Sequence, residues 1–305
     1  MPVSVNDRSR AMTSIVIAAH NEESVIGSCL DALLADPKVD QSEIIVAANG
    51  CTDNTAALAR ARGVRVIEVR QASKPAALNA GDGATDEFPR IYLDADIVVP
   101  SGGISAINEA LQASSDADGS VPLAAVPGRR LITRGRPWTV RAYFAINERL
   151  PVFRAGLFGR GMIGLSAEGR ARFDQFPEMV ADDLFLDSLF APGERVLVAG
   201  VETVVETPLT TGALLNRLVR VRRGNAAMRA AGAAGRIPPS VRSADRWSWL
   251  TDVVVPHPWL APAAVVYVVL TTVAATWAQL GSRDDLTWRR DNSTRDSSRV
   301  SGGAS

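Results

Sequence analysis

Strand-like and helix-like patterns alternate through the first third of the chain. An apolar, β-branched run is followed by a polar turn and then by helical spacing, and strand and helix alternate in this way over four predicted strands. We expect strands near residues 13–19, 43–48, 64–69 and 91–99, and helices that end near residues 35 and 62 or cover 74–81. The strands are almost entirely apolar, which is typical of a parallel sheet covered on both faces. The pattern predicts an α/β fold with a mostly parallel sheet and right-handed crossovers.

Two carboxylates interrupt the fourth predicted strand, which runs from Ile91 to Val99. Residues i and i+2 of an extended strand face the same side, so Asp94 and Asp96 converge while Ala95 points away. Ligands bind at the carboxyl ends of the strands in such sheets. Mg²⁺ or Mn²⁺ held by one or two carboxylates keeps open positions for phosphate oxygens. The pair therefore predicts a metal-diphosphate site, with a solvated strand end as the alternative.

Composition narrows the class of protein. Hydrophobic residues make up 47% and charged residues 22%, which is neither a disordered chain nor a polytopic membrane protein. The 33 basic and 33 acidic residues give a net charge of +0, so we expect no nucleic acid partner. Cys29 and Cys51 lack ligand spacing, and no apolar signal core precedes the first strand, which together favour the cytosol. Neither a Gly-x-Gly-x-x-Gly nor a P-loop motif is present.

Several short motifs follow the predicted strands in a fixed order. They are His20-Asn21-Glu22, the turn 49–55 (Asn-Gly-Cys-Thr-Asp-Asn-Thr), the helix start 74–81 (Lys-Pro-Ala-Ala-Leu-Asn-Ala-Gly) and Asp94-Ala95-Asp96. Together they resemble family 2 glycosyltransferases of the GT-A fold. The resemblance continues in residues 158–166, which are similar to the family's glycine-rich acceptor loop, and in residues 180–187, which are similar to its catalytic acidic motif.

The resemblance implies inverting, metal-dependent transfer from a nucleotide-diphospho-sugar donor to a hydroxyl acceptor. It makes Asp183 the general base, with Asp182 beside it, and assigns the Mg²⁺ or Mn²⁺ to Asp94 and Asp96. The implied donor-binding residues are Ala19, His20, Asn21, Glu22, Asn49, Asp53, Lys74, Asp94, Ala95, Arg222 and Arg223. The implied acceptor-binding residues are Gly161, Met162 and Ile163.

Two departures from the family pattern limit what it implies. The family often has Asp-Asp-Gly-Ser after the second strand, with the first Asp near the nucleotide base, where this chain has Ala-Asn-Gly-Cys at 48–51. The identity of the nucleotide base is therefore open, and either Asn49 or Asp53 takes the role of contacting it. Gly224 follows the arginines Arg222 and Arg223 where processive synthases have a tryptophan, which favours a single transfer.

Each of these residues also has a structural interpretation. Asp182 and Asp183 suit a helix N-terminus, where the helix dipole favours acidic residues. Lys74, one of only two lysines, suits either a phosphate or carboxylate partner or an ordinary first helical turn. Arg222 and Arg223 suit either a diphosphate clamp or a solvated helix face. His20 lies at a strand end and lacks further ligands, so we expect it to shape the donor pocket rather than to bind zinc.

Two other classes of protein compete with the glycosyltransferase. Residues 93–98 resemble the nucleophile strand of haloacid-dehalogenase-type phosphatases, and residues 81–86 resemble their metal motif, but the order is reversed relative to that family. A nucleotide-sugar-binding scaffold without activity is the second alternative, and Asp183 argues against it because a binder needs no base.

The C-terminal part carries an uncharged apolar run from Trp259 to Leu280. It reaches the length of about 20 residues that a membrane-spanning helix needs, yet much of it is alanine and threonine. We divide the chain into a GT-A domain at 1–250 and a membrane-associated helix with a polar tail at 251–305. A helix lying on the membrane is favoured over one that spans it or one that packs on the domain. Such an anchor suits a lipid-linked or glycan acceptor at the cytoplasmic face of the cell membrane, in envelope or exopolysaccharide synthesis.

Overall fold

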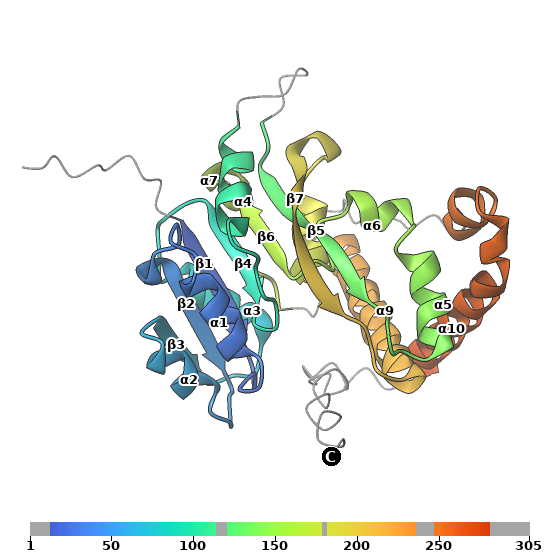
Figure 1. Cartoon of the computed structure of the whole chain (residues 1–305), viewed down its shortest axis with the longest axis horizontal. Coiled ribbons are helices and arrows are strands. Elements are labelled where there is room, and N and C mark those ends of the chain that lie inside the picture. Colours follow the sequence, from blue (N-terminus) through green and yellow to red (C-terminus); the bar gives the residue numbers. More distant parts are fainter. Residues whose placement is uncertain (1–12, 114–120, 179–181, 236–246, 281–305) are drawn as a thin grey trace, which may run out of the picture.

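A computed structural model describes residues 13–113, 121–178, 182–235 and 247–280. The strands in these ranges form one seven-stranded sheet in the order β3-β2-β1-β4-β6-β5-β7 (Figure 1). Helices cover both of its faces, as the alternating pattern predicts, and further helices gather at the end of the molecule remote from β3 (Figure 1).

The first four strands are parallel and lie side by side. They are β1 (Ser14–Ala19), β2 (Ile44–Asn49), β3 (Arg65–Val69) and β4 (Arg90–Asp94), joined by α1 (Ile26–Leu34), η1 (Gln41–Glu43), α2 (Thr55–Ala61) and α3 (Lys74–Asp82). Alternate residues of β1 enter different cores. Ile15 and Ile17 pack with α1 and α2, whereas Val16 and Ala18 pack with α3. Both faces are therefore apolar, which confirms the prediction of a doubly covered parallel sheet.

The second half of the chain completes the sheet with both parallel and antiparallel strands. It comprises α4 (Gly103–Gln112), β5 (Ala124–Ile132), α5 (Trp138–Asn147), α6 (Pro151–Ala155), β6 (Met162–Leu165), α7 (Ala167–Arg170), α8 (Asp182–Leu189), η2 (Pro192–Glu194), β7 (Arg195–Glu206) and α9 (Thr211–Ala233). Strand β6 runs antiparallel to both β4 and β5, and β5 runs parallel to β7. The antiparallel β6 brings its preceding loop, residues 156–161, to the carboxyl end of β4.

The fourth strand is shorter than predicted. It ends at Asp94, whose N–H donates to the Gly161 carbonyl at 2.8 Å and whose carbonyl accepts from Ile97 N at 3.2 Å. The chain therefore turns at Ala95 and Asp96, and the expectation of an extended strand as far as Val99 is wrong. The turn buries Ala95 and exposes Asp96.

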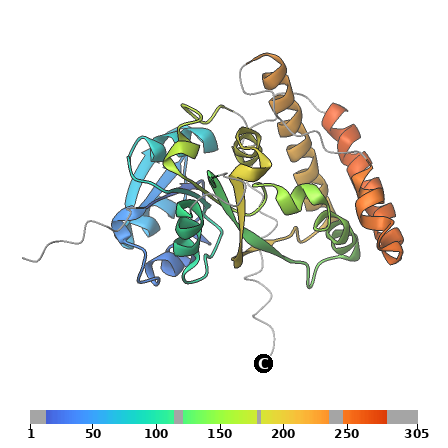
Figure 2. The same cartoon turned by 90° about the horizontal axis from the view of Figure 1, so that it is seen from above.

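The C-terminal helix packs on the second half of the chain rather than standing apart. A π-helical segment η3 (Trp249–Val254) and a short turn η4 (Pro258–Leu260) lead into α10 (Ala261–Leu280), which runs beside α5 and α9 (Figure 2). Tyr267 stacks on Tyr143 with ring centroids 5.2 Å apart, and Leu270 is buried with them. A boundary at residue 250 therefore cuts through η3 and its packing. The predicted polar tail at 281–305 lies outside the described residues.

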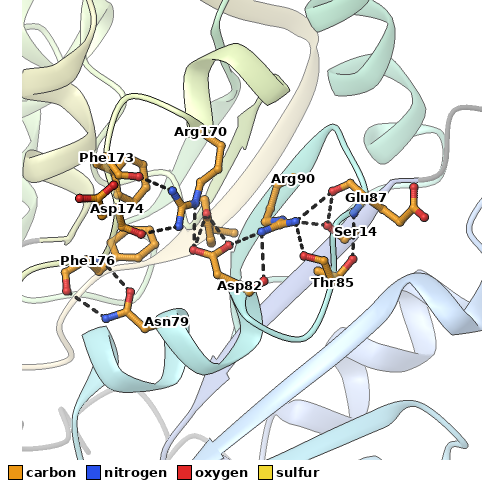
Figure 3. Close-up of polar contacts among 11 residues, drawn as sticks. Ser14, Asn79, Asp82, Thr85, Glu87, Arg90, Arg170, Phe173, Asp174 and Phe176 are labelled. Carbon is orange, nitrogen blue, oxygen red and sulfur yellow. Dashed lines mark hydrogen bonds and ion pairs between the residues drawn. The ribbon is translucent and has the colours of Figure 1, made fainter.

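A buried network centred on Asp82 ties the two halves together (Figure 3). The Asp82 carboxylate accepts from Arg90 Nη1 at 2.8 Å, from Arg170 Nε at 3.1 Å and from the Tyr92 hydroxyl at 2.8 Å. Arg90 also donates to Ser14 Oγ at 3.1 Å in β1. Asp82 lies in the motif that resembles a phosphatase metal site, and two arginines already neutralise it. This arrangement gives the aspartate a structural role.

We predict that Asp82→Ala destabilises the fold by about 3–5 kcal/mol, because it leaves two buried guanidinium groups without their counter-charge. The measurement is urea denaturation followed by circular dichroism. Asp31→Ala is the matched control, since Asp31 pairs with Arg62 at the surface, and its midpoint should stay near that of the wild type. Equal midpoints for the two variants would contradict the role given to Asp82.

Candidate active site

Charged side chains from three elements meet at the carboxyl end of β4. Lys74 Nζ lies 2.8 Å from Asp94 Oδ1 and 3.0 Å from Asp182 Oδ2, so it joins the end of β4 to the start of α8. Asp183 follows Asp182 in the first turn of the same helix. We call Lys74, Asp94, Asp182 and Asp183 the central cluster. Its members are far apart in sequence but lie together in the fold.

Local sequence explains why Lys74 reaches this point. Ser73 caps α3 by accepting from Ala76 N at 3.3 Å, and Pro75 suits the first turn, so the helix begins at Lys74. Burial opposes the charged form of Lys74, but Asp182 and Asp94 outweigh it and raise the pKa of its ammonium well above the usual value. Lys74 is therefore permanently charged and ion-paired, rather than an ordinary solvated first-turn lysine.

Asp183 has the environment of a proton acceptor. Its Oδ2 accepts from Gly159 N at 3.1 Å, in the glycine-rich loop. Burial, and then repulsion by Asp182, raise the pKa of the Asp183 carboxyl to about 6, although Lys74 and the Gly159 hydrogen bond act in the opposite direction. The two acidic residues do open a helix, as the structural interpretation expects. The helix start holds the carboxylate in place, so both interpretations apply to the same residue.

The glycine-rich loop approaches β4 closely. Gly159 and Gly161 both have φ of +70°, and a Cβ on Gly161 would lie 2.4 Å from Ile97. Of the predicted acceptor residues, Gly161 hydrogen-bonds Asp94 through its carbonyl. Met162 and Ile163 instead lie in β6 with side chains 1% and 7% exposed. Acceptor contact through those two side chains is therefore not supported. Sequence reasoning missed Gly159, although the Gly-Arg-Gly repeat pointed to it.

The polar residues after β1 and β2 interlock two loops. His20 Nδ1 lies 2.7 Å from the Asn49 carbonyl, and Asn49 Nδ2 donates to the Ala19 carbonyl at 3.0 Å. Asn21 has a φ of +55°, and its Oδ1 accepts from Thr52 N at 2.7 Å. The two strand ends and their loops are thus held in one arrangement at the predicted donor side of the sheet.

The remaining residues of these loops also have defined partners. Glu22 N donates to Thr55 Oγ1 at 2.7 Å, and Asp53 Oδ1 accepts from Thr55 N at 3.0 Å. The Asn49 side chain is fully buried, so it supports the strand ends from inside the core. Of the two candidates for contact with the nucleotide base, only Asp53 is partly exposed.

The metal prediction depends on two carboxylates of different exposure. The Asp94 side chain is 43% exposed and is bound by Lys74, whereas Asp96 lies in the exposed turn next to the buried Ala95. Burial, then Asp96, then Asp94 raise the pKa of the Cys29 thiol to about 12, so both carboxylates act on the same buried group. Within the described ranges, no three metal-ligating side chains gather. Two carboxylate oxygens fit Mg²⁺ or Mn²⁺ only when further oxygen ligands, such as those of a diphosphate, complete the shell.

The predicted arginine clamp is not joined to the central cluster. Arg222 and Arg223 lie on α9, and Arg222 acts electrostatically on Tyr143, in α5. Arg223 Nε is buried and has no hydrogen-bond partner among the described residues. No hydrogen bond or ion pair in the described part of the chain connects either arginine with Lys74 or its three aspartates. Their contact with a donor remains a prediction.

The sheet order, with carboxylates at the end of β4, is that of the GT-A fold. The mannosyltransferase PcManGT from Pyrobaculum calidifontis, in complex with GDP-Man and Mn²⁺, has the same fold, with a TM-score of 0.55. The comparison covers 89% of this chain and 76% of that chain at 17% identity.

Glucosyl-3-phosphoglycerate synthase from Mycobacterium tuberculosis, in complex with UDP, gives a TM-score of 0.46 at 22% identity, over 63% of this chain and 72% of that chain. A comparison with curated protein sequences gives no match. The model described as Glycosyl transferase family 2 matches residues 14–160. Residues 14–160 therefore carry a glycosyl transferase family 2 domain, as the motifs indicated.

We predict that Asp183→Asn stabilises the folded protein at pH 8. The Asp183 carboxyl has a pKa of about 6 when folded, against about 3.9 for an aspartate in an unfolded chain. The folded state therefore holds this proton more tightly, and stability falls as the pH rises from about 4 to 6. Removing the carboxylate should add about 2–3 kcal/mol at pH 8 and nothing below pH 4.

The measurement is the unfolding free energy of both proteins at several pH values. Asp31→Asn is a suitable control because its carboxylate is paired at the surface. A gain that is the same at pH 4 and pH 8 would show that Asp183 is not the group whose pKa is raised.

Proposed function

We propose that this protein transfers a sugar from a nucleotide-diphospho-sugar to a hydroxyl acceptor, with inversion at the anomeric carbon and with Asp183 as the general base. One observation carries the proposal: the Asp183 carboxylate has a raised pKa and is held by the glycine-rich loop, next to the Lys74 bridge between Asp94 and Asp182. A proton acceptor and the predicted diphosphate site thus lie on two sides of one lysine.

The raised pKa suits Asp183 to this step. A carboxyl with a pKa of about 6 is mostly ionised at neutral pH and is a stronger base than an ordinary aspartate. As the acceptor oxygen bonds to the anomeric carbon, its proton passes to Asp183 and the bond to the nucleoside diphosphate breaks. Lys74 pairs with both Asp94 and Asp182. These two carboxylates therefore stay ionised beside Asp183.

Asp94 and Asp96 are the residues that would hold a divalent metal. When bound, Mg²⁺ or Mn²⁺ stabilises negative charge on the departing diphosphate. The Mn²⁺ and GDP-Man in the complex of the structurally similar PcManGT support this assignment. The loops formed by His20–Glu22 and by Asp53 are the proposed donor-binding surface. A panel of nucleotide-sugars, tested by thermal shift with and without Mn²⁺, identifies the sugar and the nucleotide base of the donor.

Two substitutions separate donor binding from chemistry. Asp96→Ala should abolish Mn²⁺-dependent donor binding, because one remaining carboxylate holds the cation poorly. Asp183→Asn should retain donor binding and lower turnover by roughly 10²-fold or more, the usual scale for loss of a general base. Calorimetry gives the affinity, and release of nucleoside diphosphate gives turnover.

Asp31→Ala is the control for both measurements. If Asp96→Ala binds donor normally in Mn²⁺, the metal assignment is wrong. Near-normal turnover of Asp183→Asn would move the base to another carboxylate, such as Asp182. Tight donor binding by the wild type without any transfer or hydrolysis would identify a binding or scaffold protein instead.

We further propose that α10 associates with the cytoplasmic face of the cell membrane and that the acceptor is lipid-linked. The segment Pro258–Leu280 has a mean hydropathy of 1.8, and only 17% of it is buried. Its buried side faces α5 and α9, while Val265 and Val269 are 64% and 53% exposed on another side. An apolar helix face that the domain leaves exposed supports a surface helix. Envelope or exopolysaccharide synthesis would suit such an enzyme.

Two charges on the exposed side of α10 should release the protein from membranes. Because α10 shares a core with Tyr143, its deletion would disturb the domain, whereas Val265→Glu with Val269→Glu leaves that core intact. We expect the wild type to pellet with membranes and the double variant to move mainly to the soluble fraction.

Leu197→Glu is the control, because Leu197 is 47% exposed on β7. An alkaline carbonate wash distinguishes the alternatives, since a surface helix is extracted and a spanning helix is retained. If the wild type stays soluble without detergent and does not bind liposomes, α10 only packs against the domain and has no membrane role.

A further inference from the structure

Buried arginines near the ends of this sheet usually meet an aspartate. Arg90 pairs with Asp82 at 2.8 Å, and Arg195 pairs with Asp187 at 2.8 Å. A different arrangement occurs beside the glycine-rich loop. There, Arg129 of β5 and Arg160 of the loop before β6 both contact Phe153, and Arg217 of α9 repels Arg129 electrostatically. We call them the arginine cluster.

Neither Arg129 nor Arg160 has a carboxylate partner among the described residues. Arg129 stacks over Phe153, with its Cζ 4.6 Å from the ring centroid, and its buried Nη2 has no hydrogen-bond partner there. Arg160 is 3% exposed. Its guanidinium donates only to main-chain carbonyls, those of Gly156, Pro127, Phe153 and Arg154, at 2.9–3.1 Å. These carbonyls satisfy its hydrogen bonds but do not neutralise its charge.

The charges in the cluster oppose one another. Burial, then repulsion by Arg160 and Arg217, lower the pKa of the Arg129 guanidinium to about 10. Glu148 acts in the opposite direction and is itself paired with Arg149 at the surface. Holding like charges together away from water is unfavourable unless an anion joins them. The contrast with Arg90 and Arg195 indicates that the missing anion comes from outside the described chain.

The cluster and the proposed base adjoin the same residue. Arg129 Nη1 lies 3.2 Å from the position that a Cβ on Gly159 would occupy, and Gly159 N donates to Asp183 at 3.1 Å. Because Gly159 has no side chain, nothing separates the guanidinium from the loop backbone. An acceptor whose hydroxyl reaches Asp183 therefore has its neighbouring groups beside the arginines.

We propose that the arginine cluster binds a phosphate group of the acceptor, so that the acceptor class is a hydroxyl compound that also carries a phosphate. This inference rests on the proposed function, since it takes Asp183 as the base that faces the acceptor. The oxygens of a phosphate match the planar donors of Arg129. A phosphate carries up to two negative charges, so it neutralises three cations better than a single carboxylate does. Soluble sugar phosphates and lipid-linked phosphates share this chemistry.

The test is calorimetric titration of methyl phosphate into the full chain, with and without Mn²⁺ and saturating UDP or GDP to occupy the donor site. Arg129→Gln and Arg217→Gln should each weaken methyl phosphate binding, relative to nucleotide binding, by about tenfold or more. Arg130→Gln is the matched control. Arg130 is the next residue of β5, is 61% exposed and faces Glu202, so its substitution should leave the binding ratio unchanged. Arg217→Gln keeps the test valid if Arg129→Gln does not fold.

Flotation with phosphatidylcholine vesicles, with and without dihexadecyl phosphate, identifies the source of the phosphate. Binding of methyl phosphate that depends on Arg129 supports the proposal with a soluble acceptor. Binding to dihexadecyl phosphate vesicles that depends on Arg129 supports it with a lipid-linked acceptor. Equal methyl phosphate affinity in wild type, Arg129→Gln and Arg217→Gln would overturn it, as would acetate competing as well as methyl phosphate.

Donor hydrolysis by the same preparations separates this inference from the proposed function. If the protein hydrolyses donor but binds methyl phosphate equally well with and without Arg129, the phosphate site is wrong and the proposed glycosyltransferase function stands. If methyl phosphate binding depends on Arg129 but the protein neither binds nor hydrolyses donor, the proposed transfer is wrong. The arginine cluster would then be an anion site without that function.

Discussion

The ion pairs of Lys74 are the interaction on which the candidate active site depends. Three carboxylates, those of Asp94, Asp182 and Asp183, come from two elements that would otherwise repel each other. One partly buried ammonium, 2.8 Å from Asp94 and 3.0 Å from Asp182, holds the end of β4 against the start of α8. Burial, and then repulsion by Asp182, raise the pKa of the Asp183 carboxyl, and Lys74 offsets only part of that rise. The same charge thus assembles the site and tunes its base.

The rest of the fold keeps these two elements in register. The Asp82 network joins α3 and β4 to α7 through Arg90 and Arg170 (Figure 3). Asn79 strengthens the junction by exchanging two hydrogen bonds with the Phe176 backbone, at 3.0 and 2.7 Å. Both Asp82 and Lys74 belong to α3, so one short helix connects the two halves at each of its ends.

Charge is distributed unevenly around the glycine-rich loop. Carboxylates lie on the β4 side, where a metal-bound diphosphate is proposed, and arginines lie on the β5 and α9 side, where an acceptor phosphate is proposed. The net charge of +0 conceals this separation. Gly159 lies between the two regions and contacts both. Specificity for donor and acceptor would then follow from opposite local fields within one site.

The sequence by itself determined the alternation of strands and helices through β4, the family and the residues of the central cluster, because these depend on local periodicity and on short motifs. It did not determine the end of β4 at Asp94, since that depends on a hydrogen bond to Gly161 from a distant loop. It also assigned Met162 and Ile163 to the acceptor, where the sheet buries them. The arginine cluster was invisible in sequence because Arg129, Arg160 and Arg217 share no motif. Only tertiary structure decides which charges lie together, since Coulomb interactions depend on distance in space rather than along the chain.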